Sequence, residues 1–487
     1  MKDRIRYGTR VVVLFGTTVT LSGQSPPVLT LSQAVNEALV KNERIINQHD
    51  TIEQASLNVR LARSTFHPKV IPNVLGSFGQ TDINSQNYRV DVTQKFVTGT
   101  EVRSSVGTST AQIPSLPGDP SGDLHFYNAD TTVTLSQPLL RGFGPRIARR
   151  SLTSAELRRA EADRSQTLTE QQVAVDVASA YYRLVAQEAF VEVAKKSIDR
   201  ATTLREASEA KLVAGLVSQL DVLRAQQLVA QAEIQVFDAE SATEDARDRL
   251  VFLMGREAGE RFEVESGIPT PAAAVDVDRA VSVALANRPD LNTALASGAD
   301  AERQVSFARN QLLPQVDVNF ALTRRQTADS FARSFGLDRF QFATFFAISM
   351  PVDRTPQLIE YQNALIDRDR RKRDIATLQR RIADEVKRAV RDRNRVLRSL
   401  SAAEASVEIG RKEVEVAQLR YERGLSNNLD VVTAEGNLLN AESRRISVLA
   451  EAAVSRLSFR ALLGILDPRR DTAAGSSTSP EDVQSLP

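Results

Sequence analysis

The chain has 487 residues, of which 25% are charged, with a formal net charge of +1 and a mean hydropathy of −0.25. Past the N-terminus it has no run of about 20 apolar residues, which excludes a helical membrane protein, and its near-neutral charge gives no indication of nucleic-acid binding. Cysteine is absent, which excludes disulfides, thiol catalysis, thiolate metal sites and a lipid anchor attached through an N-terminal cysteine.

Residues 1–23 have the pattern of a signal peptide. Basic residues up to Arg10 precede the apolar stretch Val11–Phe15, and the small residues Ser22 and Gly23 offer a cleavage point. The alternative is an uncleaved cytoplasmic N-terminus. We predict export of the mature chain.

The mature chain contains one unit twice. Pro68 recurs as Pro314, an offset of 246 residues (314 − 68), and six neighbouring residues recur at the same offset. Gly215 recurs as Gly424, an offset of 209 (424 − 215), together with nine further residues. A fixed offset over tens of residues predicts a tandem duplication. The expected segments are a first repeat at 24–255, a connector at 256–276, a second repeat at 277–466 and a disordered tail at 467–487.

Strands with one apolar and one polar face are predicted before each long helical stretch, because apolar and polar residues alternate there. The first-repeat segments are 70–78, 88–97, 102–106 and 131–135, and the second-repeat segments are 316–322 and 340–346. The first repeat carries extra sequence near 82–126, which is either an added hairpin or an extended outer loop. Too few strands are present to close a barrel, and an open edge is not tolerated in lipid, so several chains are expected to share one wall. The alternative is a small water-soluble β domain.

Two helical hairpins are predicted, because residues 147–254 contain no proline and 357–466 likewise contain none. Their arms are Ile147–Ala214 with Ser218–Met254, and Leu358–Arg423 with Asn427–Leu463. Each long arm would reach roughly 100 Å, about three times the hydrocarbon thickness of a bilayer. Apolar residues spaced by seven, such as Val177 and Leu184, predict left-handed coiled-coil packing. An ordinary soluble bundle accounts for the heptads but not for this length.

The tips of both hairpins carry the same motif, Gly-Leu-x-x-x-Leu-Asp-Val-x-x-Ala, at 215–225 and 424–434. The glycines are expected to end the long arms with positive φ. Asp221 and Asp430 then follow as acidic residues in the first turn of the next helix. For Asp221, helix capping alone is a sufficient explanation.

With these motifs, and with the segment 136–140 (Ser-Gln-Pro-Leu-Leu) before the first long arm, the chain resembles the TolC-like outer-membrane efflux proteins over nearly its whole mature length. The resemblance implies an α+β fold: a homotrimer in which each protomer gives four strands to a twelve-stranded outer-membrane barrel and its helices to a periplasmic α-helical tunnel. It also implies contact with outer-membrane lipid and docking to a periplasmic adaptor and an inner-membrane transporter. No cofactor and no metal site are expected.

The resemblance also assigns candidate site residues. Asp430 matches the first acidic residue of a pore-constricting ring, Thr433 stands where a second acidic residue is frequent, and Tyr421 matches an aromatic residue that holds the tip closed. Tyr421 also suits simple heptad packing. The adaptor-docking tips would comprise Gly215, Leu216, Asp221, Gly424 and Leu425.

Three classes of function are to be distinguished. The first is a passive exit duct of a tripartite efflux or type I secretion system, for drugs, dyes, metals or secreted peptides. An enzyme is disfavoured, because the three histidines lie in different elements and no nucleophile or phosphate-binding motif occurs. A periplasmic or cytoplasmic coiled-coil scaffold accounts for the heptads but leaves the alternating strands unused. We therefore predict the exit duct.

Overall fold

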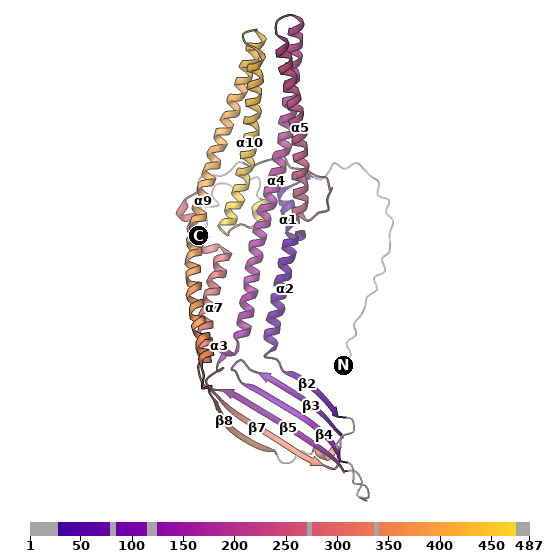
Figure 1. Cartoon of the computed structure of the whole chain (residues 1–487), viewed down its shortest axis with the longest axis vertical. Coiled ribbons are helices and arrows are strands. Elements are labelled where there is room, and N and C mark those ends of the chain that lie inside the picture. Colours follow the sequence, from indigo (N-terminus) through magenta and orange to yellow (C-terminus); the bar gives the residue numbers. More distant parts are fainter. Residues whose placement is uncertain (1–27, 78–83, 114–123, 270–274, 336–339, 474–487) are drawn as a thin grey trace, which may run out of the picture.

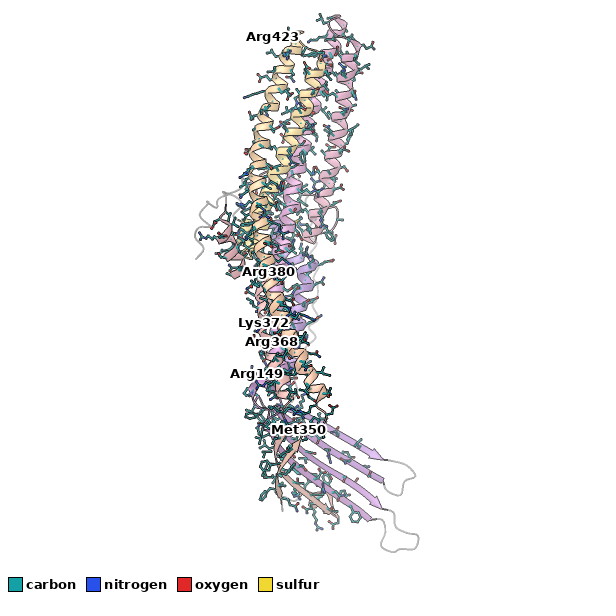
Figure 2. All side chains as sticks on the ribbon, turned by 60° about the vertical axis from the view of Figure 1, so that its left-hand side comes forward. Arg149, Met350, Arg368, Lys372, Arg380 and Arg423 are labelled. Carbon is teal, nitrogen blue, oxygen red and sulfur yellow. The ribbon has the colours of Figure 1, made fainter. Side chains whose placement is uncertain are left out.

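The computed structural model describes residues 28–77, 84–113, 124–269, 275–335 and 340–473, so the predicted signal peptide lies outside the described residues. The molecule is elongated, with two helical hairpins at one end and an obliquely inclined sheet at the other (Figure 1). Figure 2 places Met350 where the sheet meets the helices and Arg423 at the tip, at opposite ends of one long helix.

The helices follow the same order in both halves of the chain. The first half contains α1 (Leu31–Lys41), α2 (Glu43–Ser64), α3 (Pro145–Ala148), α4 (Arg150–Val213) and α5 (Gln219–Met254). The second half contains α6 (Val277–Asn287), α7 (Pro289–Gln311), α8 (Phe331–Ser334), α9 (Thr355–Glu422) and α10 (Asn428–Leu462). The long arms α4 and α9 have 64 and 68 residues, and each predicted arm agrees with its helix to within three residues at both ends.

The predicted heptad seam is buried more completely in the second hairpin than in the first. Val386, Leu400, Val407, Val414 and Tyr421 are all buried on α9. On α4, Val177 and Leu184 are fully buried, but nearer the tip the buried positions include the small residues Ala194, Ala201 and Ser208 and, among large apolar residues, Leu204, which lies outside the heptad series. Small side chains allow close approach of helices. In the half of α4 nearer the tip, small residues therefore contribute more to the packed seam than the apolar residues of the heptad series do.

One glycine in each half of the chain allows the helical hairpin to pack closely against the shorter helices of the same half. Gly255 ends α5 with a φ of 71°, and a Cβ there would lie 2.7 Å from the Lys41 carbonyl oxygen at the α1–α2 junction. Gly464 follows α10 with a φ of 74°, and a Cβ there would lie 2.9 Å from Cα of Arg288 at the α6–α7 junction. Only glycine satisfies both the positive φ and the close approach. The two halves thus make the same contact at the level where the short strands β1 (Val28–Leu29) and β6 (Glu263–Val264) pair in parallel.

The sheet corrects the expectation of four strands per chain. Within the described residues it has six antiparallel strands in the order β2-β3-β4-β5-β7-β8. Their bounds are β2 Lys69–Ser77, β3 Asn84–Lys95, β4 Glu101–Ile113, β5 Leu124–Pro138, β7 Gln315–Ala328 and β8 Gln341–Ser349. The extra first-repeat sequence, where it is described, forms the β3–β4 hairpin, which is inserted between β2 and β5. β3 pairs along its full length with β4, and β4 pairs along its full length with β5, which an extended loop could not do.

The predicted tail at 467–487 also needs a correction, because its first residues are helical. Residues Pro468–Ala473 form α11. The Asp467 carboxylate accepts hydrogen bonds from the backbone N–H groups of Arg469 and Arg470, and Asp471 pairs with Arg460 of α10 at 3.0 Å. Capping and this ion pair hold the segment against the hairpin despite its polar composition. The remainder of the tail lies outside the described residues.

Candidate functional site

The free ends of the two hairpins have the same backbone geometry. Gly215 and Gly424 each have a φ of 70°, as predicted. The next residue closes a bond back to the long arm: Leu216 N–H donates to the Lys211 carbonyl and Leu425 N–H to the Arg420 carbonyl, both at 2.8 Å. This is the Schellman turn, in which a left-handed residue satisfies the last helical carbonyls. The Leu216 and Leu425 side chains are 73% and 67% exposed, so each tip presents an apolar knob.

The two aspartates of the repeated motif differ in environment, and the capping residue three positions before each also differs, Ser218 in the first copy and Asn427 in the second. Asp221 is buried in a capping box: its carboxylate accepts bonds from the Ser218 N–H and hydroxyl, at 3.0 and 2.7 Å. Asp430 is exposed on α10, and its helix is capped instead by Asn427, whose side chain accepts from Leu429 N–H. Among the described residues, no hydrogen bond or ion pair engages the Asp430 carboxylate. Asp430 is therefore available for a role other than capping.

Tyr421 links the two hairpins near their tips. Its side chain is 3% exposed, and its hydroxyl lies 2.9 Å from Oγ of Ser208 on α4. Lys211, also on α4, donates to the Tyr421 carbonyl at 2.5 Å and lies 3.8 Å from the centre of the Tyr421 ring. One aromatic residue of α9 thus receives a hydrogen-bonding contact and a cation–π contact from the other hairpin. We call Tyr421, Ser208 and Lys211 the tip latch.

A buried ion pair lies one layer further from the tip. Glu435 of α10 is 3% exposed, and its carboxylate accepts from Arg200 of α4 at 2.6 Å and from Gln418 of α9 at 3.2 Å. Burial raises the pKa of the Glu435 carboxyl, and the Arg200 guanidinium opposes this rise. Removing either partner would leave a buried charge unpaired and lower the stability of the fold. The pair therefore specifies how α4 is placed against the α9–α10 hairpin.

The structure separates the residues that the resemblance grouped as a gate. Tyr421 is buried between the hairpins, whereas Asp430 and Thr433 are exposed on α10. The Thr433 hydroxyl donates to the Leu429 carbonyl of its own helix at 2.8 Å. Asn428, which is fully buried, donates from its amide to the Asp221 carbonyl and so joins the two tips directly.

Sequence reasoning missed Arg200, Ser208, Lys211, Asn428 and Glu435. Their partners lie on helices more than 200 residues away, apart from Gln418, and no short-range pattern marks such a pairing. Glu435 did carry a signal. It follows the buried seam residues Val431 and Ala434 of α10, where an unpaired carboxylate would be unfavourable.

Comparisons with known proteins agree with this architecture. The profile described as "Outer membrane efflux protein" matches residues 34–256 and 280–465. The chain belongs to the outer membrane efflux protein family. The predicted resemblance is thereby confirmed, and so are the outer-membrane location and the role of an exit channel for efflux.

Individual relatives are distant but similar over most of their length. The toluene efflux pump outer membrane protein TtgF of Pseudomonas putida is 23% identical over 90% of this chain and 91% of its own. The fold is similar to that of the outer membrane protein VceC of Vibrio cholerae, with a TM-score of 0.67 and 17% identity over 89% of this chain and 96% of that one. CusC, described in a study of transmembrane channel formation, gives 0.69 at 15% identity over 91% and 95%.

Proposed function

We propose that three copies of this chain form a passive duct that crosses the outer membrane through a shared β wall and continues as a helical tunnel towards the inner membrane. The proposal rests on the difference between the two ends of the elongated molecule. At one end stands a sheet whose edge strands β2 and β8 have no further partner strand among the described residues. At the other end stand charged hairpins joined by the tip latch (Figure 1). Since unpaired backbone groups are not tolerated in lipid, the sheet requires neighbouring copies.

The length of the helices supports the tunnel. At 1.5 Å per residue, α4 and α9 each reach roughly 100 Å. Among the described residues, no helix is at once long enough and apolar enough to span a bilayer. The matched turns at Gly215 and Gly424 and the matched contacts of Gly255 and Gly464 support a unit used twice. A trimer would then present six similar hairpins around its tunnel.

The tips are the proposed docking end. Leu216 and Leu425 offer quasi-equivalent apolar knobs beside Gly215, Asp221 and Gly424, suited to the hairpins of a periplasmic adaptor that in turn contacts an inner-membrane transporter. Asp430 is the proposed constriction, because its exposed carboxylate would meet two copies of itself near the threefold axis. Such a ring attracts cations. Thr433 carries no charge, so the selectivity is expected to be modest.

Assembly and transport are tested together. The protein purified in detergent is expected to be a trimer in native mass spectrometry, and its expression should restore solute resistance to a host that lacks its own exit channel. A stable monomer with intact β-sheet signal would contradict the proposal. A freely soluble protein, extracted without detergent, would favour the coiled-coil scaffold instead.

A further inference from the structure

We propose that the membrane wall built by this chain contains eighteen strands, six from each of three copies, with β8 of one copy paired to β2 of the next. The inference rests on the trimeric channel proposed above. It replaces the twelve strands that the resemblance implied, and it identifies the occupant of both sheet edges as a second copy of this chain.

The two edge strands are complementary in length and direction. β2 and β8 each have nine residues. β2 leads away from α2, and β8 leads back to α9, so the two strands run in opposite directions relative to the helices (Figure 1). Placing β8 of one copy beside β2 of the next therefore continues the antiparallel order. The same contact repeated about a threefold axis closes the ring and leaves no free edge.

Exposure distinguishes these edges from the rest of the sheet. All nine residues of β8 are exposed, as are residues 69–76 of β2, whereas most residues of the inner strand β7 are half-buried. Several exposed side chains of the edges are large and apolar, including Val74, Leu75, Phe342 and Phe346 at 70% or more. Pro72 lacks a backbone N–H and removes at most one donor from the ladders of β2.

The inserted β3–β4 hairpin has the same two faces as the strands around it. The register aligns one row across all six strands that is apolar except for a single serine: Val70, Val92, Ser104, Val133, Leu322 and Phe342. A second row on the opposite face is polar in five of six strands: Ile71, Asp91, Ser105, Thr132, Thr323 and Gln341. An apolar exterior and a polar interior are the pattern of a membrane β wall. The inserted β3–β4 hairpin therefore has the apolar and polar faces expected of a strand pair in a membrane β wall.

Polar contacts cross the inserted hairpin on that second face. Asn73 of β2 donates to the Asp91 carboxylate of β3 at 2.8 Å. Arg89 of β3 pairs with Asp130 of β5 at 3.5 Å, reaching over β4 at Gly107. A Cβ on Gly107 would lie 3.2 Å from the Asp130 carboxylate and 3.4 Å from Nε of Arg89, so the glycine leaves room for this pair.

The turn at the helical end of the hairpin is also fixed in place. Gly144 N–H donates to the Thr98 carbonyl at 3.1 Å, and the Gln94 amide donates to the Phe66 carbonyl at 2.6 Å. Gly99 has a φ of 94°, and a Cβ there would lie 2.7 Å from the Gly142 carbonyl oxygen. The hairpin is therefore anchored to the segments that lead from α2 and into α3, and not only to its neighbouring strands.

The consequence is a wider outer passage. The diameter of a barrel grows roughly in proportion to its strand number, so eighteen strands at the same tilt give about 1.5 times the diameter of twelve. Walls of this strand number leave an aqueous channel. The narrowest point of the duct would then be at the helical tips.

Engineered cysteine pairs test the wall, because the native chain contains no cysteine. Asn73→Cys is combined in turn with Ala343→Cys, Phe345→Cys and Ala347→Cys on the same face of β8, and the trimer is oxidised in detergent. We expect at least one pair to give cross-linked dimers and trimers on denaturing gels. The negative control is Asn73→Cys with Asp130→Cys, since β2 and β5 lie about 14 Å apart, beyond disulfide reach.

A deletion supplies the matched positive control. Removing residues 84–113 should place β2 beside β5 in a four-stranded sheet. Asn73 and Asp130 lie in one row of the register, so Asn73→Cys and Asp130→Cys should then cross-link within one chain. The strand number is counted directly by electron cryomicroscopy of the full-length trimer in lipid nanodiscs. A twelve-stranded wall, or a cross-link between Asn73→Cys and Asp130→Cys in the full-length chain, would overturn the inference and leave the channel intact. A monomer would overturn the channel and the wall together.

Discussion

The Tyr421 hydroxyl lies 2.9 Å from Oγ of Ser208, and this contact joins α9 of the second hairpin to α4 of the first close to the tips. Tyr421→Phe keeps the ring beneath Lys211 but removes the hydroxyl. We expect it to weaken the latch by about 1 kcal/mol, the net contribution of one buried hydrogen bond. In planar bilayers, single trimers should then open more often than the native protein.

Ser208→Ala is the matched variant. Because both substitutions remove the same bond, the double variant should open little more than either single variant. Additive effects would show that the two residues act separately, and unchanged opening in all three variants would reduce Tyr421 to a packing residue.

The second prediction contrasts Asp430 with Asp221. Asp430→Ala should remove the cation preference of single trimers, because three exposed carboxylates would be lost from the proposed constriction. Asp221→Ala should keep that preference but lower the free energy of unfolding by about 1 kcal/mol, since it breaks the capping box with Ser218. The reversal potential of single trimers in a bilayer with a salt gradient measures the cation preference. Thermal unfolding measures the loss of stability. Equal, small effects from both substitutions would leave Asp430 a helix-terminal residue only.

The third prediction compares glycines that share a positive φ but not their surroundings. Gly215→Ala and Gly424→Ala should each cost about 1 kcal/mol of backbone strain, because nothing lies within 4 Å of the added Cβ. Gly255→Ala should cost more, since its Cβ would also meet the Lys41 carbonyl oxygen. Thermal unfolding of the detergent-solubilised protein should rank Gly255→Ala as the least stable of the three.

Bulkier substitutions at the tip test docking. Gly215→Val and Gly424→Val strain the same turns further, because a β-branched residue tolerates positive φ poorly. We expect normal trimer levels with lost efflux, measured as solute resistance of the expressing cells. Unchanged resistance would count against the tips as the adaptor contact.

The fourth prediction concerns pH. Arg256, which follows α5, donates two hydrogen bonds to the Glu37 carboxylate of α1, at 2.6 and 3.0 Å, and this lowers the pKa of Glu37. A carboxyl whose pKa is lower in the folded state stabilises the fold above its unfolded pKa and loses that contribution as the pH falls through its folded pKa. Glu37→Gln should therefore lower the free energy of unfolding by about 1 kcal/mol at neutral pH.

The difference in free energy of unfolding between the native protein and Glu37→Gln should become smaller on acidification, because Glu37 of the native protein then becomes neutral as well. Thermal unfolding at several pH values, from neutral to below the usual range of glutamate, measures the change. Glu192→Gln on α4 is the control, since Glu192 pairs with Lys196 at an exposed position, and its effect should be small at every pH. A deficit for Glu37→Gln that does not vary with pH would assign its effect to packing.

The sequence predicted what depends on local pattern. The arms of both hairpins, the turns at Gly215 and Gly424 and the capping role of Asp221 follow from helix propensity, glycine conformation and capping, all of which act within a few residues. Contacts such as Arg200 with Glu435 could not be predicted, because they depend on how separate hairpins pack. The sequence alone allows either strands or a loop for the β3–β4 hairpin, since serine, threonine and glycine interrupt its alternation and only pairing with β2 and β5 defines it.

The helices on either side of the inserted hairpin, α2 and α4, remain packed as neighbours. Val59 of α2 is buried with Leu152 and Ala155 of α4, although the strands that continue these helices, β2 and β5, are separated by two others. The circumference of the proposed β wall and the diameter of the proposed helical tunnel are therefore determined by different parts of the chain. Related proteins could gain or lose a hairpin to fit the molecules they release, while keeping unchanged the end that must match their partners.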